Sequence, residues 1–251
     1  MRTDLIKTEV KNPEENSGLL DFVIAFDTTG SMNSYIGDVK KHVQEAVYNT
    51  FNDNPNIQMS IVAFGDYCDM KSQEDFGDAY QVLDLTSDQD KLVNFILKAK
   101  STSGGDGDEF YELVINKITN ETSWRKGSQK LVLLIADANP HKANYTYKNY
   151  KINITSSLDW REEAKKSSEL GIQWDTLSIR SSNAEFYREL SEITNGVHLP
   201  FKSSNKTSSL VTASALSRGP NKEVFFKSMG DHKDDVEMTA VYNAYTKKIN
   251  K

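Results

Sequence analysis

Short apolar runs alternate along the chain with stretches in which apolar residues recur at helical spacing. The runs predict strands and lie at residues 20–26, 57–64, 80–85, 130–136, 172–179 and 197–199. Helical spacing predicts helices at residues 36–51, 90–99, 110–118, 158–170, 184–194 and 210–216. This alternation predicts an α/β fold with a doubly wound, mostly parallel central sheet and helices on both faces. The more polar run at 80–85 is expected to pair antiparallel with 57–64 at an edge of that sheet.

The first predicted strand ends at an acid that opens a loop of short, oxygen-bearing side chains. Asp27, Thr29 and Ser31 stand at alternate positions after the apolar run 22–26, so one loop can direct three oxygens to one point. A carboxylate with two hydroxyls suits Mg²⁺, Mn²⁺ or Ca²⁺ better than zinc. The alternative is a strand-to-helix turn in which Thr29 or Ser31 caps the helix. Capping does not explain an acid at the end of a strand.

A second apolar strand also ends at an acid. Residues 130–136 form the most apolar run of the chain, and Asp137 follows directly. In open α/β sheets, ligands bind just outside the carboxyl ends of the strands. If both strands are central and parallel, Asp27 and Asp137 lie on the same edge, where they can hold one cation.

Composition and charge narrow the classes of partner. The chain has 251 residues, a formal net charge of −6 and no block of Lys and Arg, so nucleic acid is not expected as a partner. No apolar run approaches the roughly 18–20 residues of a membrane span, and the polar residues 1–18 lack the apolar core of a signal peptide. These features predict a cytoplasmic protein without a membrane partner.

Cysteine and histidine provide no spacing that is typical of a soft-metal site. The single cysteine, Cys68, excludes an intramolecular disulfide and any multi-cysteine metal site. The four histidines are scattered along the chain, at His42, His141, His198 and His232. Their spacing does not suggest zinc.

The first strand, the sequence from Asp27 to Met32 and the amphipathic helix that follows together resemble the first motif of von Willebrand factor A (VWA) domains. In that family the pattern Asp-x-Ser/Thr-x-Ser belongs to a metal-ion-dependent adhesion site. The form with Thr-Gly before Ser31 resembles the branch associated with atypical alpha-kinases, although no kinase domain fits in the residues that remain. The resemblance implies a Rossmann-like fold with one antiparallel edge strand.

The resemblance covers residues 19–218 and divides the chain into three parts. Residues 1–18 are expected to be an N-terminal extension, and residues 219–251 a C-terminal tail. Met238, Val241 or Tyr242, Tyr245 and Ile249 fall at helical spacing within that tail. They predict a helix that packs back on the domain, or alternatively one that binds a partner.

The resemblance also implies a set of metal ligands. These are Asp27, Thr29, Ser31, Asp106 and Asp137. The second loop departs from the commoner family pattern, because Gly104 to Gly107 places Asp106 near the position of the usual Thr. Ser103 and Thr102 are alternative ligands from this loop. A third carboxylate would raise the affinity of the site for a cation, but it would make the metal less attractive to an acidic ligand from a partner.

The function implied is binding rather than catalysis. In the family, an ion such as Mg²⁺, Mn²⁺ or Ca²⁺ completes a contact with an acidic group of a partner protein. The surrounding loops 66–79, 101–109 and 138–157 would then select the partner. Asp66 and Asp69 are expected to be acids of the rim rather than ligands.

Two other functions compete with this interpretation. The motif at Asp27 also resembles the Asp-Lys-Thr-Gly-Thr motif of aspartyl-phosphate-forming phosphotransferases and phosphatases, in which the Asp is a nucleophile. However, position 28 is Thr rather than Lys, and Thr29 stands where the phosphatases have a second Asp. The remaining alternative is a scaffold domain whose metal site is degenerate.

Overall fold

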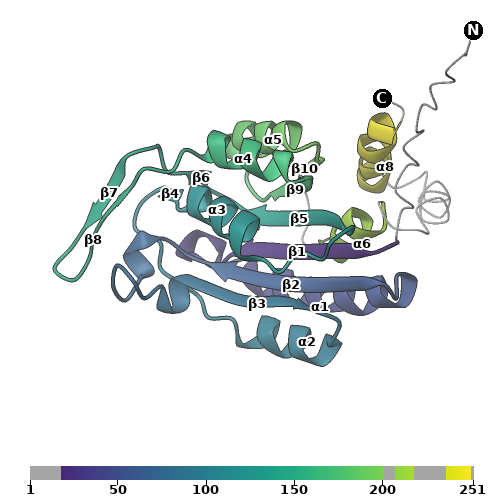
Figure 1. Cartoon of the computed structure of the whole chain (residues 1–251), viewed down its shortest axis with the longest axis horizontal. Helices are drawn as coiled ribbons and strands as arrows, with labels where there is room; N and C mark the ends of the chain where they lie inside the picture. Colours follow the sequence, from purple (N-terminus) through teal and green to yellow (C-terminus); the bar gives the residue numbers. More distant parts are fainter. Residues whose placement is uncertain (1–17, 201–206, 218–235, 250–251) are drawn as a thin grey trace, which may run out of the picture.

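The apolar runs assemble into one main sheet, with β1 near its centre (Figure 1). The computed structural model describes residues 18–200, 207–217 and 236–249. In this part of the chain, six strands follow the order β10-β9-β5-β1-β2-β3. Their bounds are Leu20–Asp27 (β1), Ile57–Phe64 (β2), Tyr80–Thr86 (β3), Gln129–Ala136 (β5), Ile172–Ser178 (β9) and His198–Pro200 (β10). All residues of β1 are buried, as a strand covered on both faces requires.

The register of the sheet confirms the predicted fold class. Strand β1 runs parallel to β2, with Asp27 opposite Phe64, and parallel to β5, with Phe26 opposite Ile135. Strands β9 and β10 continue the parallel arrangement. Strand β3 lies at the edge and pairs antiparallel with β2, as its more polar pattern predicted. The carboxyl ends of β1, β2 and β5 therefore meet at one edge of the sheet.

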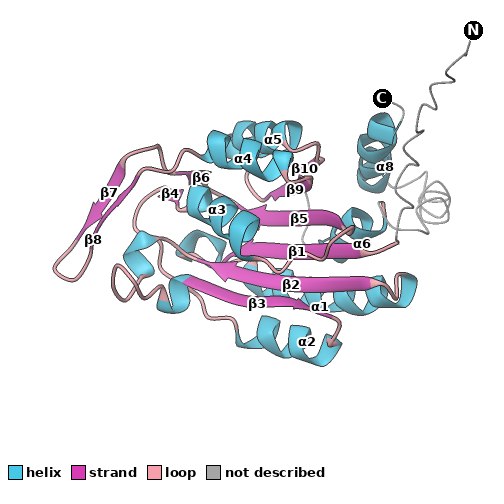
Figure 2. Cartoon of the chain, viewed as in Figure 1, coloured by secondary structure: helices cyan, strands magenta, loops and turns pink. Residues whose placement is uncertain are grey.

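Helices cover both faces of the sheet, as Figure 2 shows. Their bounds are Ile36–Asp53 (α1), Gln89–Lys98 (α2), Tyr111–Glu121 (α3), Trp160–Glu169 (α4), Ala184–Ile193 (α5), Thr207–Leu216 (α6) and Val236–Ile249 (α8). Strand β1 separates two apolar cores: Phe22, Ile24 and Phe26 pack with α1, α2 and α6, whereas Val23 and Ala25 pack with α3, α4 and α5. This division follows from the two-residue period of a strand, which directs alternate side chains to opposite faces.

The long polar connection at 138–157 contains structure that its sequence pattern did not predict. Strand β6 (Asn139–Pro140) pairs with β4 (Asp108–Glu109), and β7 (Tyr145–Lys148) pairs antiparallel with β8 (Asn153–Ser156). The β7–β8 hairpin projects beyond the edge at which β1, β2 and β5 end (Figure 1). Tyr150, between the two hairpin strands, is 89% exposed.

Helix α8, within the predicted tail, packs on the domain. Val241 and Tyr245 are buried in the core that includes α1 and α6. The Tyr245 hydroxyl donates a hydrogen bond of 2.8 Å to Oδ2 of the buried Asp175. The remaining tail residues and the predicted extension 1–18, apart from Gly18, lie outside the described residues.

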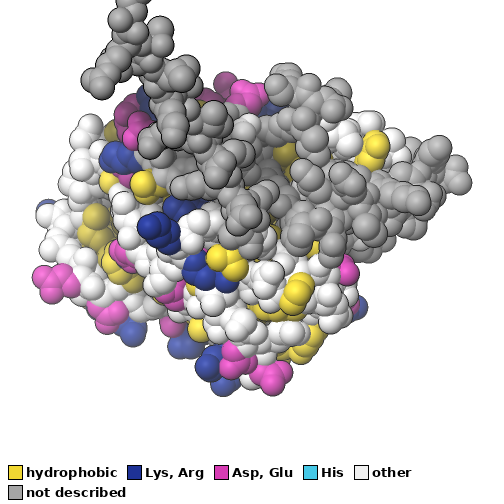
Figure 3. Space-filling view, turned by 45° about the vertical axis from the view of Figure 1, so that its right-hand side comes forward, with side chains coloured by type: hydrophobic (Ala, Val, Ile, Leu, Met, Phe, Trp, Pro, Cys, Tyr) yellow, Lys and Arg dark blue, Asp and Glu magenta, His cyan; other side chains and the backbone are white. Residues whose placement is uncertain are grey.

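No helix among the described residues combines the length and apolar character that crossing a membrane requires. On the face shown in Figure 3, basic and acidic side chains are interspersed over the described residues, without a continuous basic stripe.

Candidate metal centre

Backbone hydrogen bonds hold the loop after β1 at the carboxyl edge of the sheet. The Thr28 amide donates to the Phe64 carbonyl at the end of β2 (2.8 Å), and the Thr102 amide donates to the Thr28 carbonyl (2.9 Å). The Gly30 amide donates to the Ser103 carbonyl at 3.0 Å. The loop after β1 is therefore fixed against both the end of β2 and the loop that precedes α3.

Asp27 is fully buried at the end of β1. Its Oδ1 accepts a 2.7 Å hydrogen bond from the Thr29 amide, and its Oδ2 accepts one of 2.5 Å from the Tyr111 hydroxyl. Burial raises the pKa of Asp27 to about 7, although the hydrogen bonds from Tyr111 and Thr29 act to lower it. The nearby charge of Asp137 adds to the increase in this pKa. A bound cation would favour the ionised carboxylate instead.

A chain of hydrogen bonds connects four of the five predicted ligands. Thr29 Oγ1 lies 3.2 Å from Ser31 Oγ, and Ser31 Oγ donates to Asp137 Oδ1 at 2.7 Å. With the bond between Asp27 and the Thr29 amide, these contacts run from one acid to the other. The two strands therefore bring Asp27 and Asp137 to the same small region, as the sequence predicted.

Asp137 is buried and is held from the loop after β9. The Asn183 side-chain amide donates to the Asp137 carbonyl at 2.7 Å. Arg180 Nε lies 3.1 Å from Asp137 Oδ2, which has no hydrogen bond of good geometry within the described structure. The Arg180 side chain is half exposed to solvent. Arg180 and Asn183 were not predicted, although they follow a strand that ends at the same edge.

The second loop approaches this group through its backbone. Gly104 has a positive φ of 70°, and a Cβ there would lie 2.7 Å from Glu109 Oε1 and 3.2 Å from Thr29 Cβ. Glycine is therefore required both by its conformation and by the lack of space. Glu109 was not among the predicted ligands.

Glu109 is a buried acid beside the first loop. Its Oε2 has no hydrogen-bond partner in the described structure. Burial, together with the charges of Asp27, Asp66 and other nearby acids, raises the pKa of Glu109 to about 10. Uncompensated buried acids of this kind indicate a region that favours added positive charge.

Asp106 makes its contacts in a different group. Its Oδ2 accepts a hydrogen bond from the Tyr145 hydroxyl at 3.0 Å, and its Oδ1 accepts one from the Asp108 amide at 3.1 Å. Its nearest potential co-ligands are Asp66 and His141, with ligand atoms all within 4.8 Å of one another. The hydrogen-bonded group around Asp27 thus contains four of the predicted ligands, while Asp106 lies with Asp66 and His141.

Asp69 organises the second loop, as an acid of the rim. Its carboxylate accepts hydrogen bonds from the amides of Ser103 (2.8 Å) and Gly104 (3.1 Å). Both oxygens are used, and Oδ2 also accepts from the Asp66 amide at 3.1 Å. These bonds explain why the loop comes close to Thr29.

The residues around Asp27 fit a hard divalent cation. They provide two carboxylates and two hydroxyls, which is the oxygen chemistry that Mg²⁺, Mn²⁺ and Ca²⁺ prefer. Asp137 Oδ2 also lacks a well-formed hydrogen bond in the described structure. Thr28 does not join the group, because its hydroxyl donates to the Phe64 carbonyl at 2.8 Å.

The chain is similar to known proteins in both sequence and fold. The putative ariadne-like RING finger protein R811 of Acanthamoeba polyphaga mimivirus is 24% identical over 210 residues, which are 76% of this chain and 19% of that protein. The chain therefore spans about a fifth of the length of this relative. Residues 21–214 match the model of the von Willebrand factor type A domain.

Solved structures show the same fold at low sequence identity. The pilus adhesin SpaC from Lactobacillus rhamnosus GG is 12% identical with a TM-score of 0.57, and the match covers 83% of this chain and 30% of SpaC. Proximal thread matrix protein 1 from the mussel byssus, with a zinc-occupied metal-ion-dependent adhesion site (MIDAS) motif, is 15% identical with a TM-score of 0.56. That match covers 80% of this chain and 46% of the mussel protein. The family model matches more than half of the residues of this chain, so this protein belongs to the von Willebrand factor type A family.

Proposed function

We propose that this protein is a non-catalytic binding module whose bound divalent cation completes a contact with an acidic group of a partner protein. Asp27, Thr29, Ser31 and Asp137 would hold the cation, with Mg²⁺ as the first candidate and Mn²⁺ or Ca²⁺ as alternatives. The observation that carries the proposal is the chain of hydrogen bonds that joins these four residues at one edge of the sheet, through the Thr29 amide and the side chains. Asp106 is not needed for this set of ligands.

The ligands are supported by groups that restrict their movement. The Tyr111 hydroxyl donates to Asp27 at 2.5 Å and accepts from the Ala138 amide at 3.1 Å, so it links the loops that carry the two acids. Arg180 supplies a positive charge beside Asp137. Because Arg180 is half exposed, its guanidinium can turn to solvent when a cation takes over that charge.

The structural relatives support this proposal through what their names state. One is a pilus adhesin, and another is a byssus matrix protein with zinc in its MIDAS motif. VWA domains are protein-interaction modules, and an adhesion-type role fits that class. Membership of the alpha-kinase-associated branch is a further part of the proposal, and it rests on the Gly104 to Gly107 loop.

The environment of Thr28 favours binding over phosphoryl transfer. Aspartyl-phosphate enzymes have a Lys at the equivalent position of their motif. Here the Thr28 hydroxyl bonds the Phe64 carbonyl at 2.8 Å and lies 3.1 Å from the Thr102 hydroxyl, so it serves the loop structure. We therefore propose no enzymatic role for Asp27.

Thermal unfolding with and without divalent cations tests the metal site. A ligand that binds only the folded state at 100 times its Kd adds about 2.7 kcal/mol to the free energy of unfolding, so Tm should rise with Mg²⁺, Mn²⁺ or Ca²⁺. Asp27→Asn should abolish this rise, because it removes a ligand charge while keeping a side chain of similar shape. Asp88→Asn is the matched control, because Asp88 caps α2 away from the site and Asn is also a good cap.

The binding role requires a second measurement. Capture of partners from a lysate in Mg²⁺ should exceed capture in a chelator, and Asp27→Asn should show only the chelator level. An unchanged Tm with all three cations would contradict the metal site. A rise in Tm with capture that is independent of both the metal and Asp27 would contradict the adhesion mechanism.

A further inference from the structure

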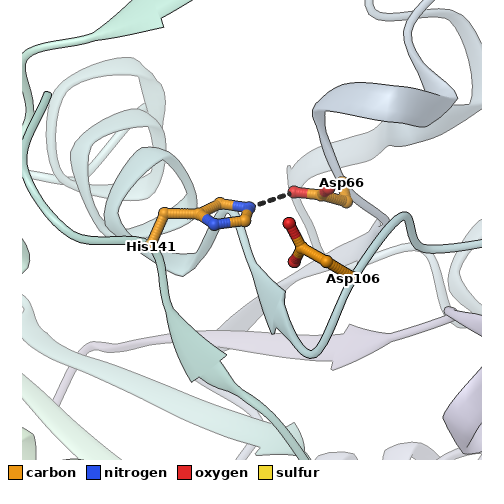
Figure 4. Close-up of side chains that lie close together, drawn as sticks. All are labelled: Asp66, Asp106 and His141. Atoms are coloured by element: carbon orange, nitrogen blue, oxygen red, sulfur yellow. Dashed lines mark hydrogen bonds and ion pairs between the residues drawn. The ribbon is translucent and has the colours of Figure 1, made fainter. Parts of the chain in front are cut away.

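A second group of potential metal ligands lies on the same edge of the sheet. Asp66 follows β2, Asp106 precedes β4 and His141 follows β6. One ligand atom from each of the three residues lies within 4.8 Å of the other two. Figure 4 shows the three side chains directed toward one another, with His141 Nε2 at 2.7 Å from Asp66 Oδ1.

One carboxylate oxygen of Asp66 has no hydrogen-bond partner in the described structure. This oxygen is Oδ2, and Asp66 is fully buried. A Cβ on Gly105 would lie 3.7 Å from this oxygen, so the oxygen faces the backbone next to Asp106. His141 is also buried, whereas Asp106 is exposed. The group is therefore anchored inside the protein and accessible from solvent on one side.

Acidic side chains outnumber basic ones around this group. Glu109 and Glu112 are buried nearby, and each has one carboxylate oxygen without a hydrogen-bond partner among the described residues. Within the described residues, Asp66 forms an ion pair with His141. Asp106, Glu109 and Glu112 form none there. A buried acid of this kind is kept neutral by a proton, as the pKa of about 10 for Glu109 indicates, unless a cation compensates its charge.

Neighbouring groups orient two of the three side chains. The Tyr145 hydroxyl donates to Asp106 Oδ2, and the Tyr145 ring stacks on the His141 ring with centroids 3.6 Å apart and planes 13° apart. The Asp108 amide holds the other oxygen of Asp106 at 3.1 Å. Such outer contacts are typical of metal sites, where they fix ligand orientation.

We propose that Asp66, Asp106 and His141 form a second metal site, which binds a borderline divalent ion such as Zn²⁺. An imidazole ligand favours Zn²⁺ and related transition ions, whereas Mg²⁺ and Ca²⁺ take oxygen ligands. In tetrahedral zinc sites, bonds of about 2.0–2.2 Å place ligand atoms roughly 3.3–3.6 Å apart. The pair of His141 and Asp66 would thus open by somewhat under 1 Å, on the order of what the zinc bond lengths require. Water would complete the coordination on the exposed side of Asp106.

The second site would connect parts of the chain that the first site does not hold. His141 and Asp106 both contact Tyr145, which is the first residue of the β7–β8 hairpin. A metal bound to both would fix the base of this hairpin to the loops after β2 and before β4. The inference is independent of the proposed function, because it involves none of the four ligands around Asp27.

Zinc binding to the full chain tests this inference. Equilibrium dialysis against Zn²⁺, with excess Mg²⁺ present to occupy the first site, should give one tightly bound zinc by elemental analysis. His141→Gln and Asp106→Asn should each weaken zinc binding at least about tenfold, as loss of a ligand or its support does. His42→Gln is the matched control, because His42 pairs with Glu45 on α1 outside the cluster. Asp106→Asn alters an exposed side chain, so it remains informative if His141→Gln does not fold.

Cobalt spectroscopy and an Asp27 variant separate the two sites. Co²⁺ in place of zinc should give visible absorption bands that change in Asp106→Asn and are retained in Asp27→Asn. Zinc that is lost in Asp27→Asn but retained in Asp106→Asn and His141→Gln would overturn the inference, because it would place the ion in the first site. The absence of tightly bound zinc from the wild-type protein would also overturn it. Failure of the proposed function would appear separately, as the lack of Mg²⁺ stabilisation.

Discussion

Acidification is expected to weaken cation binding at the first site through the protonation of Asp27. Burial raises the pKa of Asp27 to about 7, against an ordinary value of 3.8. A cation must therefore displace a proton from this carboxyl at mildly acidic pH. An exposed aspartate would already be ionised there and would show no such competition.

The magnitude follows from the ionised fraction of Asp27. With a pKa of about 7, roughly 3% of the carboxyl is ionised at pH 5.5 and roughly 76% at pH 7.5. Affinity for the cation should therefore fall about 25-fold between pH 7.5 and pH 5.5 if Asp27 is the titrating ligand. With the ordinary pKa, the same change of pH would alter the affinity by only a few per cent, on the order of the protonated fraction that remains.

Isothermal titration calorimetry with Mg²⁺ or Mn²⁺ measures this dependence. At pH 6, runs in buffers of different ionisation enthalpy should reveal the release of about 0.9 proton per bound ion. Circular dichroism at each pH checks that the protein remains folded. An affinity that changes less than about threefold over this range, or binding without proton release, would refute the reasoning.

The same pKa has a consequence for stability without metal, with a defined sign. Because the pKa of Asp27 is raised on folding, its contribution is fully present below the unfolded value of 3.8 and is lost as pH rises through about 7. The cost at higher pH is on the order of 4 kcal/mol for a shift of this size. Asp27→Asn should remove that part of the pH dependence in urea unfolding with chelator. Equal pH profiles for wild type and variant would contradict the assigned burial effect.

Three substitutions test the fold itself by urea unfolding, with the exposed Leu97→Ala as a control that should change stability by less than about 0.5 kcal/mol. Gly196→Ala should lower the free energy of unfolding by at least about 2–3 kcal/mol, because the alanine Cβ would lie 1.7 Å from a backbone carbonyl oxygen of β9. An effect equal to that of the control would contradict this packing. Arg125→Met should cost about 3 kcal/mol, because it leaves the buried carboxylate of Asp21 without the Nε partner at 2.6 Å. Tyr245→Phe should cost about 1.5–3 kcal/mol by removing a hydrogen bond to a buried carboxylate, and a cost near zero would show that α8 does not dock as described.

The succession of strands and helices along the chain could be predicted from sequence, and so could the position of Asp27, Thr29, Ser31 and Asp137 at one edge of the sheet. Each apolar run is long enough to form a strand of a buried sheet. Parallel strands have their carboxyl ends at the same edge of the sheet. Asp27 and Asp137 follow such strands directly, so backbone direction alone places them together. Thr29 and Ser31 are close in sequence to Asp27, and local loop geometry brings their hydroxyls near it.

The sequence did not reveal the groups that surround these acids. Tyr111 lies on α3, yet its hydroxyl reaches across 84 positions in sequence to Asp27. Its apolar ring fits the helical stripe, so the pattern predicts only a core residue. Arg180 is likewise one cation among many, and it acquires significance only through its 3.1 Å contact with Asp137.

What the sequence determined by itself was the alternation of strands and helices, together with the acids that end two central strands. These features depend on periodicity and chain direction, which are local properties. The tertiary structure decided that Asp106 faces His141 and Asp66, and that scattered residues 75 positions apart make a 2.7 Å contact. Such contacts depend on how separate loops fold over the edge of the sheet, and no local pattern specifies that packing.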